Sequence, residues 1–146
     1  MTRAELPADA RVVVIGGGIV GCSVAYHLGK LGYSDTVLLE RDVLTSGTSW
    51  HAAGIVGPLR SSYNLTRLSM YAVELFEGLE TETGQATGYR RTGGLWLAQT
   101  QDRMAELHRT SANGEIAGLE AGIITPAEVA RHWPQLKVDD LAGALW

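Results

Sequence analysis

The sequence predicts an α/β fold that opens with a βαβ unit, and residues 11–40 carry most of the evidence. An unbroken β-branched run at residues 12–15 is followed by the pattern G-x-G-x-x-G, formed by Gly16, Gly18 and Gly21. A helical stretch and a second apolar strand come next, and Glu40 ends that strand. This order of strand, glycine turn, helix, strand and acid is typical of a Rossmann-like dinucleotide-binding unit.

Each part of the glycine turn has a physical task in such a unit. Gly16 allows the tight turn, Gly18 lets the backbone approach a pyrophosphate, and Gly21 lets the helix pack close to the strand. Free backbone N–H groups at the helix start, around Ile19 and Val20, attract phosphate charge. An ordinary glycine-rich turn is the alternative. It explains neither the acid after the second strand nor the small residues Ala25 and Gly32 along the helix.

Glu40 narrows the choice of nucleotide. It lies 24 residues beyond Gly16. An acid roughly 20 residues after the glycines accepts hydrogen bonds from a ribose diol in such units. A carboxylate there repels a 2′-phosphate, so NADP is disfavoured, and NAD and FAD both remain open.

The segment after the second strand favours FAD. Residues 45–57 read TSGTSWHAAGIVG, a run of small residues in place of a plain crossover helix. Hydroxyl groups of Thr48 and Ser49 can bond phosphate or ribitol oxygens, and the Gly and Ala residues permit close approach by a large planar ligand.

At this point the chain resembles the D-amino-acid-oxidase-like family of flavoproteins, and within it the dimethylglycine and sarcosine dehydrogenases. The resemblance is carried by the run T-S-W-H-A-A-G at residues 48–54 and by the pair Glu40-Arg41. It continues through RTGGLWLA at residues 91–98 to GALW at residues 143–146, and therefore covers nearly the whole chain.

The resemblance implies an FAD-dependent enzyme that oxidises the C–N bond of small N-methylated amino acids by hydride transfer to flavin. A small amine is then the substrate, and a separate electron acceptor reoxidises the flavin. The residues expected at the cofactor are Gly16, Gly18, Ile19, Val20, Gly21, Glu40, Arg41, Gly47, Thr48, Ser49, Trp50, His51, Ala52, Ala53, Gly54 and Ile55. No catalytic acid or base and no metal ligand is identified.

His51 occupies the position at which this subfamily bonds its flavin covalently. A histidine is mostly neutral near pH 7, so its imidazole can act as a nucleophile toward the flavin 8α carbon. Two alternatives remain open, namely noncovalent packing of His51 against the flavin and a plain polar loop residue.

The remainder of the chain predicts further helices and a β-hairpin, as part of a glutathione-reductase or D-amino-acid-oxidase type of flavin fold. Apolar residues at i, i+3 and i+4 spacing predict a long helix over residues 62–83. Residues 89–100 read as a hairpin with a turn or bulge at Gly93-Gly94, followed by a short helix over residues 101–111. A capping box with proline starts a helix at residue 125, and residues 141–146 read as a strand.

We expect residues 1–10 to form a tail and residues 11–146 to form the N-terminal part of an oxidoreductase domain that is incomplete at its C-terminus. The alternative is a small protein that completes its sheet with a partner subunit. Folate is expected only with a further C-terminal domain. The net charge of −4 argues against nucleic-acid binding. Neither a signal sequence nor a run of ~20 apolar residues is present, so we expect a cytoplasmic location without membrane insertion.

Two other functions stay open from the sequence. An NAD-dependent dehydrogenase fits the βαβ unit but leaves residues 45–57 unexplained. A non-catalytic dinucleotide-binding module or subunit fits both segments. The oligomeric state is left open.

Overall fold

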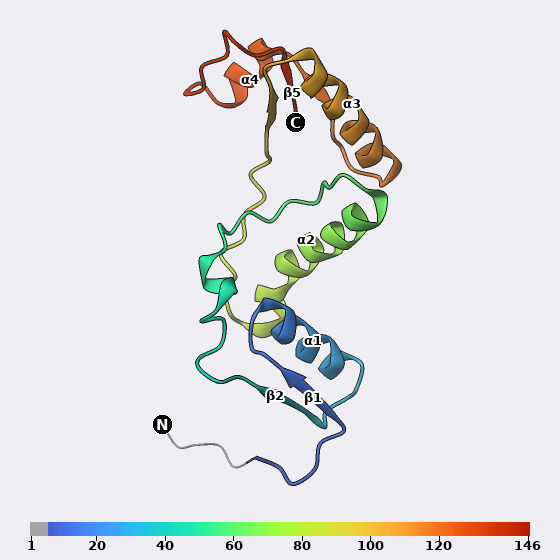
Figure 1. The fold of residues 1–146 in the computed structure, drawn as a ribbon, viewed down its shortest axis with the longest axis vertical. Helices are drawn as coiled ribbons and strands as arrows, with labels where there is room; N and C mark the ends of the chain where they lie inside the picture. Colours follow the sequence, from blue (N-terminus) through green and yellow to red (C-terminus); the bar gives the residue numbers. More distant parts are fainter. Residues whose placement is uncertain (1–5) are drawn as a thin grey trace. The chain divides into compact units, whose positions relative to one another are not determined.

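The computed structural model describes residues 6–146, so residues 1–5 of the predicted tail lie outside the described residues. The chain forms two compact units, one ending at Ile55 and the other beginning at Val56. Figure 1 labels most of their helices and strands. Each unit has its own sheet, and each is described on its own below.

The first unit contains the βαβ arrangement that the sequence predicts. Strand β1 (Val12–Ile15) leads through the glycine turn into helix α1 (Ile19–Lys30), which returns the chain to strand β2 (Thr36–Leu39). The strands pair in parallel, with Val12 opposite Thr36 and Ile15 opposite Leu39. A 3-10 helix, η1 (Thr48–His51), follows in the loop after β2.

Strand β1 is covered on one face only by the described residues. Val14 lies beneath α1, because a Cβ built at Gly21 of that helix would meet the Val14 Cγ1 atom at 3.5 Å. On the opposite face Val13 is 50% exposed and Ile15 is 86% exposed. A β-branched run such as residues 12–15 is typical of a parallel strand that is covered on both faces. The structure shows cover on the face that packs against α1.

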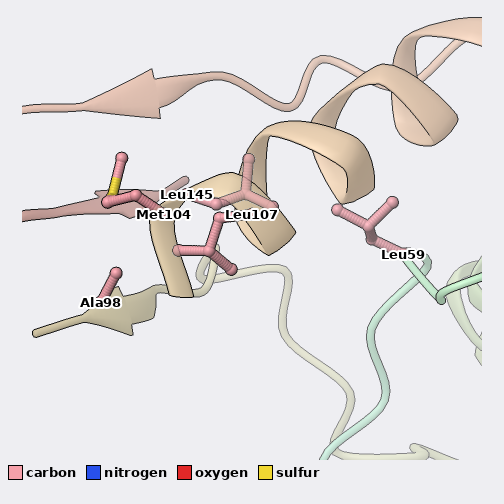
Figure 2. Close-up of a cluster of buried hydrophobic side chains, with 5 residues drawn as sticks. All are labelled: Leu59, Ala98, Met104, Leu107 and Leu145. Atoms are coloured by element: carbon pink, nitrogen blue, oxygen red, sulfur yellow. The ribbon is translucent and has the colours of Figure 1, made fainter. Parts of the chain in front are cut away.

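The second unit packs helices against a small antiparallel sheet. Its elements are α2 (Tyr63–Thr83), β3 (Trp96–Ala98), α3 (Gln101–Ile116), β4 (Ile123–Ile124), α4 (Pro126–His132) and β5 (Gly143–Leu145). The strand order is β3-β5-β4. Figure 2 shows the apolar cluster of this unit, made by Leu59, Ala98, Met104, Leu107 and Leu145. Leu107 and Leu145 are each 1% exposed, so the contact between α3 and β5 forms the centre of the cluster.

The helix starts of the second unit follow the sequence closely. Helix α4 begins with the predicted capping box, in which Thr125 accepts the Glu128 N–H and the Glu128 carboxylate accepts the Thr125 N–H. Helix α2 covers the predicted range. Ser62 at its N-cap makes no side-chain cap, and the buried Thr66 hydroxyl instead bonds the backbone of Arg60.

The hairpin predicted over residues 89–100 is wrong. Strand β3 pairs with β5 from the far end of the chain, and residues 89–94 form no strand. Gly93 has a φ of +78°, which takes the backbone out of the extended conformation there. Helix α3 also extends beyond the predicted end at residue 111, to Ile116, and the Ser111 hydroxyl within it donates to the Ala121 carbonyl.

The described part of the chain has no helix that is both long and apolar enough to cross a membrane. Nor do the described residues bring together His, Cys, Asp and Glu side chains in a group able to hold a metal ion.

Gly93 gives a sharp test of packing in the second unit. A Cβ at this residue would overlap the Trp146 indole ring, and its positive φ is itself unfavourable for any other residue. We expect Gly93→Ala to lower the free energy of unfolding by roughly 1–3 kcal/mol, measured by denaturant unfolding. Gly94→Ala is the matched control, because no atom lies within 4 Å of a Cβ there. Equal stabilities of the two variants would contradict the packing of Trp146 on Gly93.

Candidate functional site

The glycine turn between β1 and α1 is organised around Gly17. Among the described residues up to Ile55, Gly17 alone is buried. Its N–H donates to the Glu40 carboxylate at 2.7 Å, and its carbonyl accepts the Thr45 N–H at 2.8 Å. A Cβ at Gly17 would lie 2.5 Å from Leu44 Cδ2 and 3.0 Å from Glu40 Cβ. A side chain at Gly17 would therefore displace Leu44 and crowd Glu40, where the turn meets the end of β2 and the loop beyond it.

Glu40 lies at the carboxyl end of β2, beside the turn. Its second oxygen accepts the Asp42 N–H at 3.2 Å. The hydrogen bond from Gly17, followed by the one from Asp42, lowers the pKa of the Glu40 carboxyl below its usual range. The carboxylate is thus charged at neutral pH and stands where the βαβ unit places the acid for a ribose diol.

The start of α1 offers backbone donors to an anion. Gly18 is the N-cap and makes no side-chain cap, and the Ile19 N–H is taken by the Ser49 hydroxyl at 2.9 Å. The N–H groups of Val20 and Gly21 have no hydrogen-bond partner among the described residues. First-turn N–H groups of this kind, together with the helix dipole, attract phosphate.

Gly21 fixes how close α1 comes to the turn. A Cβ at Gly21 would collide with the Gly16 carbonyl oxygen. The glycine turn therefore has the close packing and open donors that a dinucleotide pyrophosphate requires, and its residues fit that group.

The loop after β2 lies against the same turn. Thr45 contacts Gly17 through its N–H, and Ser49 contacts the first residue of α1. Ser49 belongs to η1, in which the Trp50 N–H donates to the Gly47 carbonyl at 3.2 Å. His51 ends the same element, with its Nδ1 atom 3.1 Å from the Gly47 carbonyl oxygen.

Several of the residues predicted to contact the cofactor are exposed. Arg41 is exposed beside Glu40, where its charge adds a small lowering of the Glu40 pKa. Trp50 is 78% exposed and Ile55 is 87% exposed. Ala52, Ala53 and Gly54 are also exposed. Their predicted role at the cofactor stays a prediction.

Gly17 and Thr45 were not among the site residues predicted from the sequence. The G-x-G-x-x-G pattern directs attention to its named glycines, and Gly17 occupies the variable position between them. The run of consecutive glycines at residues 16–18 is the signal that was available. Thr45 has a φ of 65°, which no sequence pattern predicts, because β-branched residues rarely adopt a positive φ.

Comparison with known proteins identifies relatives along almost the whole chain. Residues 11–146 match the family described as DAO, FAD dependent oxidoreductase. The chain is 47% identical to the mitochondrial pyruvate dehydrogenase phosphatase regulatory subunit of Mus musculus, over 97% of this chain and 16% of that protein. It is 45% identical to mitochondrial sarcosine dehydrogenase of Mus musculus, over 97% and 16% of the two chains.

Mitochondrial dimethylglycine dehydrogenase of Rattus norvegicus is 39% identical, over 94% of this chain and 16% of that protein. The chain thus spans about a sixth of the length of these relatives. Among solved structures, L-proline dehydrogenase from P. horikoshii superposes with a TM-score of 0.89 at 27% identity. That match covers 97% of this chain and 37% of the dehydrogenase.

Glu40 predicts a pH dependence of stability. Because its folded-state pKa is lowered, its contribution is complete above the ordinary glutamate pKa of about 4.3 and is lost as the pH falls through the folded-state value. We expect wild-type protein to lose thermal stability more steeply than Glu40→Gln below that pH, in melts from about pH 6 to about pH 3. Glu74→Gln, an exposed change on α2, should keep the wild-type profile. Parallel profiles for wild type and Glu40→Gln would contradict the contact with Gly17.

Proposed function

The chain belongs to the DAO family of FAD-dependent oxidoreductases, and from that premise we propose that its glycine turn and the following loop hold FAD. The observation that carries the proposal is the open pair of N–H groups at Val20 and Gly21, next to the charged Glu40. The N–H groups bind the pyrophosphate, and Glu40 accepts hydrogen bonds from the ribose of the adenosine half. Family membership leaves the NAD-dependent alternative without support.

We propose His51 as the covalent attachment point of the flavin. A carbonyl oxygen only accepts, so the contact with Gly47 places the imidazole proton on Nδ1. Nε2 is then the unprotonated nitrogen and the nucleophile. Bound FAD would supply the 8α methyl group: when Nε2 bonds to its carbon, the methyl group would lose a proton to solvent. The two electrons left on the flavin would pass to the enzyme's electron acceptor.

The substrate we propose is a small secondary or tertiary amine with a carboxylate, of the N-methylglycine or N,N-dimethylglycine type. The sarcosine and dimethylglycine dehydrogenases among the relatives support this class. The chemistry that bound FAD supplies is acceptance of a hydride from the carbon next to the amine nitrogen. The residues of this chain bind and orient the cofactor for that step.

A second candidate is a non-catalytic subunit that retains the cofactor fold. The regulatory subunit that shares 47% identity with this chain supports it, because a protein named for regulation has the same sequence pattern as the dehydrogenases. Anaerobic mixing separates the two functions. We expect N-methylglycine or N,N-dimethylglycine to bleach the flavin absorbance of the whole protein. A protein that keeps FAD and is bleached by no N-methylated amino acid is the regulatory kind.

The covalent link is tested by acid precipitation of the whole protein. Trichloroacetic acid releases noncovalent flavin into the supernatant, whereas a histidyl link keeps it with the precipitate. We expect the yellow colour and flavin fluorescence to stay with the wild-type pellet and to leave the His51→Ala pellet.

The alanine variants of His27, His108 and His132 serve as controls and should keep coloured pellets. Colour in the wild-type supernatant would disprove attachment. A His51→Ala pellet that stays coloured would disprove the residue assignment.

A further inference from the structure

The loop that carries His51 is tied to the glycine turn at two points. Ser49 accepts the Ile19 N–H at 2.9 Å, across 30 positions of sequence. Thr45 donates its N–H to the Gly17 carbonyl at 2.8 Å. Both partners belong to the segment proposed to hold the pyrophosphate, whereas η1 ends at the residue proposed to face the flavin. The two halves of the proposed site are thus joined by protein contacts.

Gly18 leaves the space that the Ser49 contact needs. A Cβ at Gly18 would lie 3.3 Å from the Ser49 Oγ atom, and no other atom would lie within 4 Å of it. This distance is tighter than most real contacts of a Cβ atom. The absence of a side chain at Gly18 therefore serves the Ser49 hydroxyl as well as an approaching phosphate.

Thr45 shows that the loop is held in place by its surroundings. It is the one residue other than glycine with a positive φ among those described. A β-branched residue keeps such a conformation only where neighbouring contacts determine it. The contact with Gly17 on one side and the Ser49 contact on the other supply that constraint.

Ser49 and His51 share one short element. In η1 the Trp50 N–H bonds Gly47, and the His51 ring contacts the same carbonyl. A 3-10 helix rises only about 2 Å per residue, so an anchor at Ser49 also fixes the residue that ends the turn. The Ser49 contact uses the Ile19 donor and leaves those of Val20 and Gly21 open.

We infer that Ser49 is a positioning residue, which anchors the His51 loop to the start of α1 and so presents it to the flavin half of FAD. The inference rests on the proposed function. In this role Ser49 accepts the Ile19 N–H at the start of α1 and holds the flavin-facing loop there. A direct phosphate ligand would instead contact the pyrophosphate. The distinction is measurable, because ADP contains the pyrophosphate and lacks the flavin.

The experiment uses the whole protein in a His51→Ala background, in which flavin binding is reversible. Adding Ser49→Ala should weaken FAD binding about ten-fold. The same change should leave ADP binding within about two-fold, because Val20 and Gly21 keep their donors. Ser49→Thr retains the hydroxyl and should restore FAD binding. Ser46→Ala removes a neighbouring hydroxyl that lies outside both contacts and serves as the matched control.

The alternatives give different results. Equal losses for FAD and ADP would show that Ser49 is a phosphate ligand, and unchanged binding of both would show that the contact has no role, so either result overturns the inference. Failure of wild-type protein to bind FAD would overturn the proposed function instead. Amide exchange at Ile19 in cofactor-free wild type tests the anchor without any ligand. We expect protection that Ser49→Ala removes, and unprotected exchange in wild type would overturn the inference.

Discussion

The backbone of Gly17 is the constraint on which the candidate site depends. Its N–H binds the acid at the end of β2, and its carbonyl accepts both the Thr45 N–H and, at 3.4 Å, the Cys22 thiol of α1. One peptide therefore joins the strand end, the helix start and the following loop. A side chain there would displace Leu44 and crowd Glu40, so glycine suits the junction. Buried backbone groups need partners, and here those partners hold the site together.

The residues of this junction are held by contacts within the protein. The Glu40 carboxylate is charged and already hydrogen-bonded, and the first donor of α1 is already used by Ser49. The next donors, at Val20 and Gly21, remain open to an anion. Contacts of this kind within the protein reduce the ordering that binding imposes on it. The exposed apolar residues Val13 and Ile15 belong to the same sheet but to the face away from α1.

The sequence predicted the first unit well because its determinants are local. The β-branched run, the glycines and Glu40 define strand, turn and strand end within a short stretch, and the capping box at Thr125 is equally local. The hairpin failed because β3 finds its partner near residue 145, a pairing that no local pattern reveals. Gly17 and Thr45 were missed for a related reason, since their importance arises from tertiary contacts. The domain boundaries and the cytoplasmic location stay predictions.

The architecture of the turn separates cofactor binding from chemistry. The described contacts are the hydrogen bond from the Gly17 N–H to Glu40 and the one from the Ile19 N–H to Ser49, and neither of them requires a reacting substrate. A regulatory subunit and two dehydrogenases share at least 39% identity with this chain over nearly its whole length. Sequences similar to this chain therefore occur in relatives whose names give different functions. Within this chain, we propose the Nε2 atom of His51 as the reactive group of the loop. The His51 ring contacts the Gly47 carbonyl, and Ser49 of the same 3-10 helix accepts the Ile19 N–H.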